Sequence, residues 1–215
     1  MASSPIILGI NFANTALAAT AISAATRQLL QSWILPLNLQ QAFLSSVEAI
    51  NVQFNELLQQ IGQAGALPQA IIFTSESNAI IGVGSDGKAT TPLLPATRIR
   101  ECIGINQVEC FTTLPDYFAA QLTQTFPDCI TLSVAQSLGY FDAHSQAWEI
   151  TRIEAEGMAS SKFPSILPER TAIGQIGQCA VLGAIHISRL AEIADETTNT
   201  HESIAKRAAL SLLLP

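Results

Sequence analysis

A short polar turn interrupts the apolar start of the chain and carries side chains that can bind an anion. The segment IILGINFANTALAATAIS spans residues 6–23, and its turn contains Asn11, Asn14 and Thr15. Amide and hydroxyl groups donate hydrogen bonds, so these three residues are candidate phosphate ligands. Asparagine lacks the charge that a hard cation such as Mg²⁺ prefers, and we expect no metal site here. The alternative is a polar β-turn without a ligand.

A second polar run follows the apolar segment QAIIFT at 69–74. It contains Ser75, Ser77 and Asn78, and a loop at the end of a strand is well placed to face a pocket. Arg100 adds a guanidinium group that can pair with a carboxylate or a phosphate. The alternatives for these residues are a solvated loop and a surface arginine.

His186 is the candidate for proton transfer. It ends the apolar segment AVLGAIH, where we expect a strand to pass into a helix. The pKa of free histidine is roughly 6.5, so the side chain can act as a base at neutral pH. The alternative is a structural histidine. A further histidine, His144, lies close to Asp142 in sequence, and we interpret both as structural residues of a turn.

The four cysteines and three histidines do not form a metal-binding motif. They are widely scattered, and no CxxC pair is present, whereas metal sites need closely spaced ligands. The sequence therefore predicts no metal site, and we expect the cysteines to be buried free thiols.

Composition narrows the classes of function. Hydrophobic residues make up 48% of the 215 residues and charged residues only 13%, which predicts a sizeable core and a surface partly covered by a partner. The net charge of −7 argues against a nucleic-acid surface or an anionic membrane. The start of the chain has no positively charged region typical of a signal peptide, and we expect a cytoplasmic protein without a transmembrane segment.

The patterning around the candidate residues predicts an α/β arrangement. Alternating apolar segments indicate three antiparallel strands at Ile6–Phe12, Ala16–Ser23 and Leu29–Leu37. Apolar residues at spacings of three and four predict a helix over 39–61, with Asn38 as its N-cap. The strand at 69–74 then follows a crossover, so it should run parallel to the first strand.

The rest of the chain contains weaker signals. The dipeptide Asp86-Gly87 predicts the turn of a hairpin over 80–92. Apolar spacing and glycine stops predict further elements, which are helices at 114–126 and 150–157, a strand running into a helix over 180–194, and a last helix at 201–214. The polar run at 195–200 is expected to be a loop.

Three segments of the chain resemble the N-terminal half of the FGGY carbohydrate kinases, in particular the gluconate and xylulose kinase branch. They are the opening hairpin, the segment IIFTSESNAIIGVGSDGKATTPLL, and residues 137–176. The third is the most specific, because several residues keep the family's register: Gly139, Phe141, Asp142, Trp148, Gly157, Leu167, Pro168 and Gly174. The resemblance covers most of residues 6–190.

The resemblance implies an α/β fold of the ribonuclease-H-like type, as in the actin-like ATPase superfamily. This fold is a mixed sheet flanked by helices, and the chain would form a single lobe over residues 1–215, with a core at 5–194 and a C-terminal helix at 201–214. In the family a sugar lies between two lobes, and ATP is held mainly by the second lobe. We therefore expect no cofactor on this chain alone, and Mg-ATP only if a second lobe is supplied.

The resemblance also indicates that the catalytic motifs are degenerate. The hairpin of the family carries an aspartate and a glycine, where this chain has Asn11 and Ala13. The sugar-contacting Met-His pair of the family matches Ser77 and Asn78. Of its Trp-x-Asp-x-Arg motif only Arg100 is kept. The family's aspartate base matches His186.

We therefore expect a carbohydrate-kinase-like domain that binds a sugar, a sugar acid or a polyol. Two alternatives remain, and the first is a non-catalytic protein-interaction or assembly module, favoured by the apolar last helix. The second is the sugar-binding half of a split kinase, completed by a separate ATP-binding chain. The partners that these alternatives allow are a second copy, an ATP-binding chain and a small carbohydrate. A different ribonuclease-H-like protein is the remaining interpretation.

Overall fold

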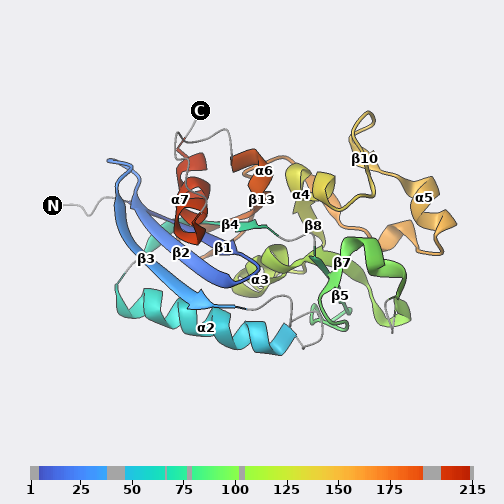
Figure 1. Ribbon diagram of the computed structural model, residues 1–215, viewed down its shortest axis with the longest axis horizontal. Coiled ribbons are helices and arrows are strands. Elements are labelled where there is room, and N and C mark those ends of the chain that lie inside the picture. The colour runs from blue at the N-terminus through green and yellow to red at the C-terminus, as the bar shows by residue number, and fades with distance from the viewer. Residues whose placement is uncertain are drawn as a thin grey trace.

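The computed structural model describes residues 5–37, 47–65, 67–76, 79–101, 105–190 and 200–213. Its centre is a six-stranded mixed sheet with the order β12-β13-β4-β1-β2-β3 (Figure 1). The strands are β1 (Ile6–Phe12), β2 (Ala16–Ser23), β3 (Leu29–Pro36), β4 (Pro68–Ser75), β12 (Ala172–Ile176) and β13 (Cys179–His186). Strands β1, β4 and β13 run parallel, and β2, β3 and β12 are antiparallel to their neighbours.

The opening of the fold agrees with the sequence pattern. The predicted meander of three strands, the following helix and the parallel strand β4 are all confirmed. Strands β1 and β2 are buried almost throughout, because helices cover both faces of the sheet. The described helix α2 (Val47–Gln63) buries residues at spacings of three and four. Asn38 and the rest of the predicted helix before Val47 lie outside the described residues.

Helices α2 and α3 (Leu114–Thr123) cover one face of the sheet, and their side chains form one core with β1. Four aromatic rings meet in it, and those of Phe12 and Phe118 stack with centroids 5.3 Å apart. Helices α6 (Ile187–Leu190) and α7 (His201–Ser211) cover the other face in smaller apolar clusters. The sheet therefore lies between two layers of helices (Figure 1).

Helix α7 packs against its own sheet. Its contacts with β1, β2 and β4 bury Ala205, Ala208 and Ala209. Gly9 of β1 makes this packing possible, because a Cβ there would overlap the carbonyl of Ala205. Part of the apolar surface that favoured an assembly module, at Ala208 and Ala209, is therefore covered within the chain.

Most of the segment between β4 and β12, apart from helix α3, forms an insert beside the sheet, at the right in Figure 1. A small sheet joins β5 (Ala79–Val83) to β6 (Leu94–Pro95) and β7 (Cys110–Thr113). The remaining short elements are η1 (Ala96–Glu101), η2 (Ile105–Gln107), β8 (Cys129–Thr131), α4 (Leu132–Ser137), β9 (Phe141–Asp142), β10 (Ala147–Trp148), α5 (Ile150–Ala155), η3 (Ser160–Lys162) and β11 (Ser165–Leu167).

The insert differs from two sequence predictions. The turn at Asp86-Gly87 forms, but the expected second strand of that hairpin is only an isolated bridge between Val83 and Ala89. Strand β5 pairs instead with β6 and β7. The helix predicted to reach residue 126 ends at Thr123, because Gln124 takes a left-handed conformation whose N–H bonds back to the last turn.

The other predicted elements are present with small changes. Helix α5 is followed by Gly157 at a φ of 80°, and β13 passes directly into α6. Helix α7 ends at Ser211 rather than at residue 214. Residues 191–194 of the predicted helix and 195–199 of the predicted loop lie outside the described residues.

Cysteine burial agrees with the sequence prediction for Cys110 and Cys179, which are buried free thiols, while Cys129 is a half-buried free thiol. Burial raises the pKa of Cys110 to about 12. Cys102 lies outside the described residues. Within the described ranges, no helix has the length and hydropathy needed to cross a membrane, and no three metal-ligating side chains cluster.

Candidate functional site

The predicted anion site at the first hairpin already holds a carboxylate of the chain itself. Asn11, near the end of β1, is completely buried, and its Nδ2 donates to Oε1 of Glu76 at 3.1 Å. Glu76 is held there because its backbone N–H donates to the carbonyl of Phe12, directly after the parallel strand β4. The Asn11 amide that was predicted to bind phosphate therefore already donates one of its two N–H groups to a carboxylate of the chain.

His201 joins the same group from the far end of the sequence. It is the first residue of α7, whose N-cap Thr200 accepts a hydrogen bond from the Ser203 N–H. The His201 Nε2 lies 2.9 Å from Thr15 Oγ1, and its Nδ1 lies 3.6 Å from Glu76 Oε1. We refer to Asn11, Thr15, Glu76 and His201 as the hairpin cluster. The third predicted phosphate ligand, Asn14, is exposed.

Two buried polar atoms adjoin the hairpin cluster. Asn11 of β1 and Thr74 of β4 are partners in the parallel register, and both side chains are completely buried. Asn11 Oδ1 and Thr74 Oγ1 have no hydrogen-bond partner among the described residues. Most buried polar atoms in proteins are paired, so this end of the sheet has unused capacity for hydrogen bonds.

His186 lies at the same end of the sheet, where β13 pairs it with Ser75 of β4. Its Nδ1 lies 2.9 Å from Ser188 Oγ and accepts a hydrogen bond from the Ser188 N–H at 3.3 Å. These contacts favour the neutral ring with its proton on Nε2. The Nδ1 lone pair is then used in the hydrogen bond from Ser188, and Nε2 has no lone pair left to take another proton. Burial also lowers the pKa of His186. Its role as a base stays a prediction, and these contacts weigh against it.

The backbone before His186 is held by a buried carboxylate that the sequence patterns did not reveal. Asp116 of α3 is buried, accepts a hydrogen bond from the Ala184 N–H at 3.1 Å and another from Thr113 Oγ1 at 2.5 Å. The Ala184 carbonyl accepts from Thr131 Oγ1. These bonds satisfy backbone groups where β13 departs from regular pairing with β4. Burial raises the pKa of Asp116 to about 6.

The predicted sugar-binding residues are only partly described. The backbones of Ser75 and Arg100 belong to β4 and η1, but their side chains lie outside the described part of the chain, as do Ser77 and Asn78. The structure therefore brings together Asn11, Thr15 and the strand ends that carry Ser75 and His186. Asp142 and His144 form a tight turn, because Asp142 Oδ1 accepts from the His144 N–H at 2.9 Å.

Sequence reasoning missed Glu76, His201 and Asp116. Glu76 had a signal, because it lies in the polar run after β4 beside the residues that were chosen. His201 had none, because its neighbours Thr15 and Glu76 are more than a hundred residues away in the sequence. Asp116 follows a proline at the start of a predicted helix, where an acidic residue is expected for helix stability alone.

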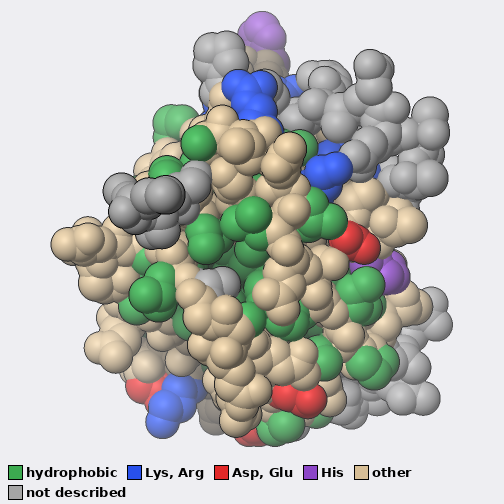
Figure 2. Space-filling view, turned by 90° about the vertical axis from the view of Figure 1, so that its left-hand side faces the viewer, with side chains coloured by type: hydrophobic (Ala, Val, Ile, Leu, Met, Phe, Trp, Pro, Cys, Tyr) green, Lys and Arg blue, Asp and Glu red, His purple; other side chains and the backbone are tan. Residues whose placement is uncertain are grey.

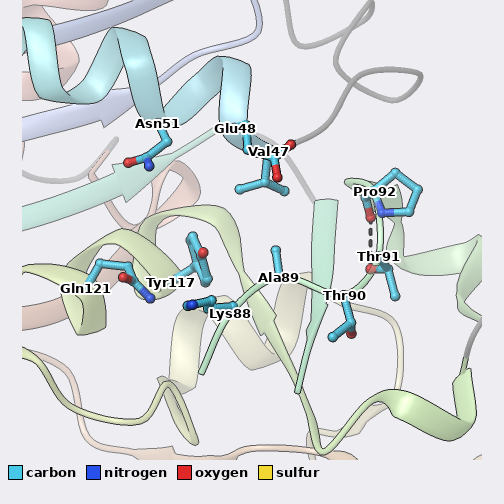
Figure 3. A pocket seen from close by; sticks show the side chains of 10 residues that line it. All are labelled: Val47, Glu48, Asn51, Lys88, Ala89, Thr90, Thr91, Pro92, Tyr117 and Gln121. Atoms are coloured by element: carbon cyan, nitrogen blue, oxygen red, sulfur yellow. Dashed lines mark hydrogen bonds between the residues drawn. The ribbon is translucent and has the colours of Figure 1, made fainter. Parts of the chain in front are cut away.

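A cavity of about 560 Å³ opens on the side of the sheet covered by α2 and α3 (Figure 3). Glu48 and Asn51 of α2 face Lys88 and Gln121 across it. Its full lining is Val47, Glu48, Asn51, Lys88, Ala89, Thr90, Thr91, Pro92, Tyr117 and Gln121. None of these is a predicted site residue. The mixture of carboxylate, ammonium, amide and aromatic groups suits a small polar molecule.

Comparison with known proteins gives a fold. The chain is similar to a ligand-bound xylulose kinase from Lactobacillus acidophilus, with a TM-score of 0.71, 14% identity, and coverage of 88% of this chain and 49% of that one. A gluconate kinase from the same organism has a TM-score of 0.71 and 12% identity, and the match covers 89% of this chain and 50% of that one. Plasmodium falciparum glycerol kinase with ADP has a TM-score of 0.67 and 11% identity, and the match covers 88% of this chain and 50% of that one. No family model and no curated protein matches the sequence.

These likenesses confirm the predicted fold class. The chain has the mixed-sheet, ribonuclease-H-like fold of FGGY carbohydrate kinases, and it spans about half the length of the solved structures it matches. Because the sequence identities are only 11–14%, the similarity shows the fold and nothing further.

Proposed function

We propose that this chain is a carbohydrate-kinase-like domain that does not transfer phosphate by itself. The observation that carries the proposal is the contact of Asn11 Nδ2 with the Glu76 carboxylate at 3.1 Å. Phosphoryl transfer depends on placing phosphate and a cation beside each other with stabilised charge. Here a carboxylate lies at the hairpin, where it repels phosphate, and Asn11 offers no charge to hold Mg²⁺.

The contacts of His186 support the same proposal. A base that accepts a proton from a sugar hydroxyl needs a free lone pair directed at that hydroxyl. The Nδ1 lone pair of His186 is directed at Ser188 instead. Among the described residues, the hairpin and the end of β13 thus offer no suitable group for two of the chemical steps of a sugar kinase.

The ligand that we propose is a sugar, a sugar acid or a polyol. It would bind at the strand ends beside Ser75, Ser77, Asn78, Arg100 and His186, in a cytoplasmic protein. Asn11 Oδ1 and Thr74 Oγ1, which have no hydrogen-bond partner in the described part of the chain, support a polar ligand at this end of the sheet. Mg-ATP would be used only with a second lobe on another chain.

A thermal-shift screen tests the proposal. We expect one or more members of a panel of sugars, sugar acids and polyols to raise the melting temperature, with a stabilisation of about 1.4 kcal/mol at tenfold excess over Kd. Mg-ATP alone should cause no shift, and no ADP should form with the sugar present. A shift with Mg-ATP, or ADP release in the presence of the stabilising sugar, would contradict the absence of catalysis.

Variants locate the sugar. Arg100→Ala is expected to abolish the shift, whereas Asn51→Ala, in the cavity beside α2, should leave it unchanged. The reverse result would move the sugar to the cavity lined by Asn51 and Lys88. ADP formation that appears only after a separate ATP-binding chain is added would favour the split kinase.

A second experiment isolates the internal carboxylate. Glu76→Gln removes the negative charge beside Asn11, so we expect inorganic phosphate to bind about fivefold more tightly, equivalent to about 1 kcal/mol. Titration calorimetry at fixed ionic strength measures the change. Glu56→Gln, on the exposed side of α2, is the matched control and should have no effect. Equal affinities of Glu76→Gln and the parent protein would show that Glu76 does not exclude anions.

A further inference from the structure

The strand β3 forms one edge of the six-stranded sheet and has a partner on only one side. It pairs with β2 from Pro36 back to Leu29, and no other described strand pairs with it. A bulge near Leu30 leaves Gln31–Pro36 as the regular part of this edge. An unpaired edge offers backbone donors and acceptors to another strand.

This edge lacks most of the usual protection against pairing. Natural edge strands often carry charged residues, yet Leu29–Pro36 contains none. Leu29, Leu30 and Ile34 are 42%, 52% and 54% exposed, and they are three of the large hydrophobic residues most exposed in the described chain. Figure 2 views the molecule from the side where β3 lies in Figure 1, and hydrophobic side chains gather near the middle of that face while charged ones lie toward its margins.

The direction of the free backbone groups follows from the pairing with β2. The Leu37 N–H donates inward to the carbonyl of Thr15. Because backbone groups alternate along an antiparallel strand, Trp33 and Leu35 also face β2, whereas Ser32 and Ile34 direct their N–H and C=O groups outward. Pro36 falls at an outward position, where its missing N–H breaks no bond with β2.

We propose that β3 pairs antiparallel with β3 of a second copy of this chain, about a two-fold axis at Ile34. In this register Ile34 faces Ile34 of the second copy, and each Ser32 faces Pro36. Ile34 exchanges two backbone hydrogen bonds with its counterpart. Each Ser32 N–H donates to the Pro36 carbonyl of the other copy, a bond that does not require the N–H that proline lacks. The two sheets become one continuous sheet of both copies. This proposal is independent of any ligand or catalytic role.

A second copy fits this edge better than an unrelated strand because the edge is self-complementary. The two-fold axis places the same uncharged segment on both sides, as a closed symmetric dimer requires. The chain carries a net charge of −7, so two copies repel each other where their charged surfaces meet. The uncharged edge Leu29–Pro36 is a place where they can approach without this repulsion. The carboxylate of Glu202 next to β3 accepts a hydrogen bond from Ser32 Oγ at 3.0 Å and is thus directed toward its own chain.

Sedimentation equilibrium of the 215-residue protein over a wide concentration range measures the association. We expect a monomer–dimer equilibrium, and Ile34→Lys should raise the dimer Kd by about tenfold or more, because two ammonium groups then meet at the axis. The matched control is Ile176→Lys, since Ile176 is 42% exposed on β12, the opposite edge of the sheet. This control should leave the Kd unchanged.

Cysteine cross-linking tests the register. Directly opposed residues in a hydrogen-bonded antiparallel pair have Cα atoms about 5.5 Å apart, which suits a disulfide. Ile34→Cys should therefore form a covalent dimer under mild oxidation. Leu29→Cys, also at an exposed position but five residues from the axis, should not, because about 30 Å would separate its two copies. The parent protein, oxidised in the same way, is the control for cross-linking through the cysteines that the chain already contains.

The proposal is overturned by a protein that stays monomeric at every concentration, which would leave the edge to a strand of another protein. It is equally overturned by a dimer that Ile34→Lys does not weaken or that Ile176→Lys weakens more. Cross-linking of Leu29→Cys as fast as Ile34→Cys would exclude the register with Ile34 at the axis. Circular dichroism confirms that each variant is folded before its association is measured.

Discussion

Replacement of Gly9 by alanine is expected to lower the free energy of unfolding by about 3 kcal/mol, at the upper end of the usual cost of overpacking. The added Cβ would overlap the backbone carbonyl of Ala205 and lie 2.9 Å from its carbon atom. A backbone group cannot move aside by changing a rotamer, so β1 and α7 must separate. Urea denaturation followed by tryptophan fluorescence measures the loss.

Gly62 supplies the control for this experiment. A Cβ at Gly62, in helix α2, meets no atom within 4 Å. Gly62→Ala should therefore stabilise the protein by about 0.5–1 kcal/mol through helix propensity. If the two alanine variants had the same stability, the close packing of α7 on β1 would be disproved.

The same change should affect the hairpin cluster. His201 begins α7, so a displaced helix carries the His201 ring away from Thr15 and Glu76. Glu76 then loses its contact with His201 and keeps its hydrogen bond from Asn11. We expect the NMR chemical shifts of the His201 ring, recorded at one fixed pH, to differ between Gly9→Ala and the parent protein, and to be unchanged in Gly62→Ala. The packing of one glycine thus determines the geometry of a site at the far end of the helix.

The sequence patterns were sufficient for the first four strands of the central sheet because their signals are local, whereas strand β12 was not predicted. The strands β1 to β3 alternate or run apolar between turns, and α2 repeats apolar residues at helical spacing. The parallel direction of β4 follows from the helical crossover that precedes it. These features depend only on residues close in the sequence, so they could be predicted before the structure was known.

The insert and the site depend on contacts between distant residues. Strand β8 has three residues and pairs with β11, which starts more than thirty residues later, so neither has a period long enough to detect. The partners of the predicted anion ligands, Glu76 and His201, come from a loop and a C-terminal helix. The residue types at the hairpin indicated an anion site, but only the fold shows that the anion belongs to the chain.

Stability is expected to fall by roughly 3 kcal/mol as the pH rises from about 4 through 6, owing to Asp116 alone. Burial raises the pKa of this carboxyl from 3.8 to about 6, although its bonds from Thr113 and Ala184 act in the opposite direction. Between these two values the unfolded chain has already released the proton while the folded chain retains it. The unfolded state is therefore favoured as the pH rises, and the loss levels off above the folded pKa.

Asp116→Asn tests this assignment. The amide keeps the shape of the carboxyl, can accept from the Ala184 N–H, and carries no titratable proton. Urea unfolding at several pH values should show that the variant lacks the decline seen in the parent protein. Asp142→Asn is the contrasting control, because hydrogen bonds from Ser145 and His144 lower the pKa of Asp142, so its contribution is lost as the pH falls.

The outcome bears on the end of β13 as well as on stability. Asp116 binds the backbone two residues before His186, and Ser133 Oγ accepts from the His186 N–H at 3.1 Å. If the decline in stability persisted in Asp116→Asn, the titrating group would lie elsewhere, and Asp116 would not be the group that anchors the strand through a buried charge. If the decline disappears, the position of His186 rests on a carboxyl that must lose its proton near neutral pH at a cost to the fold.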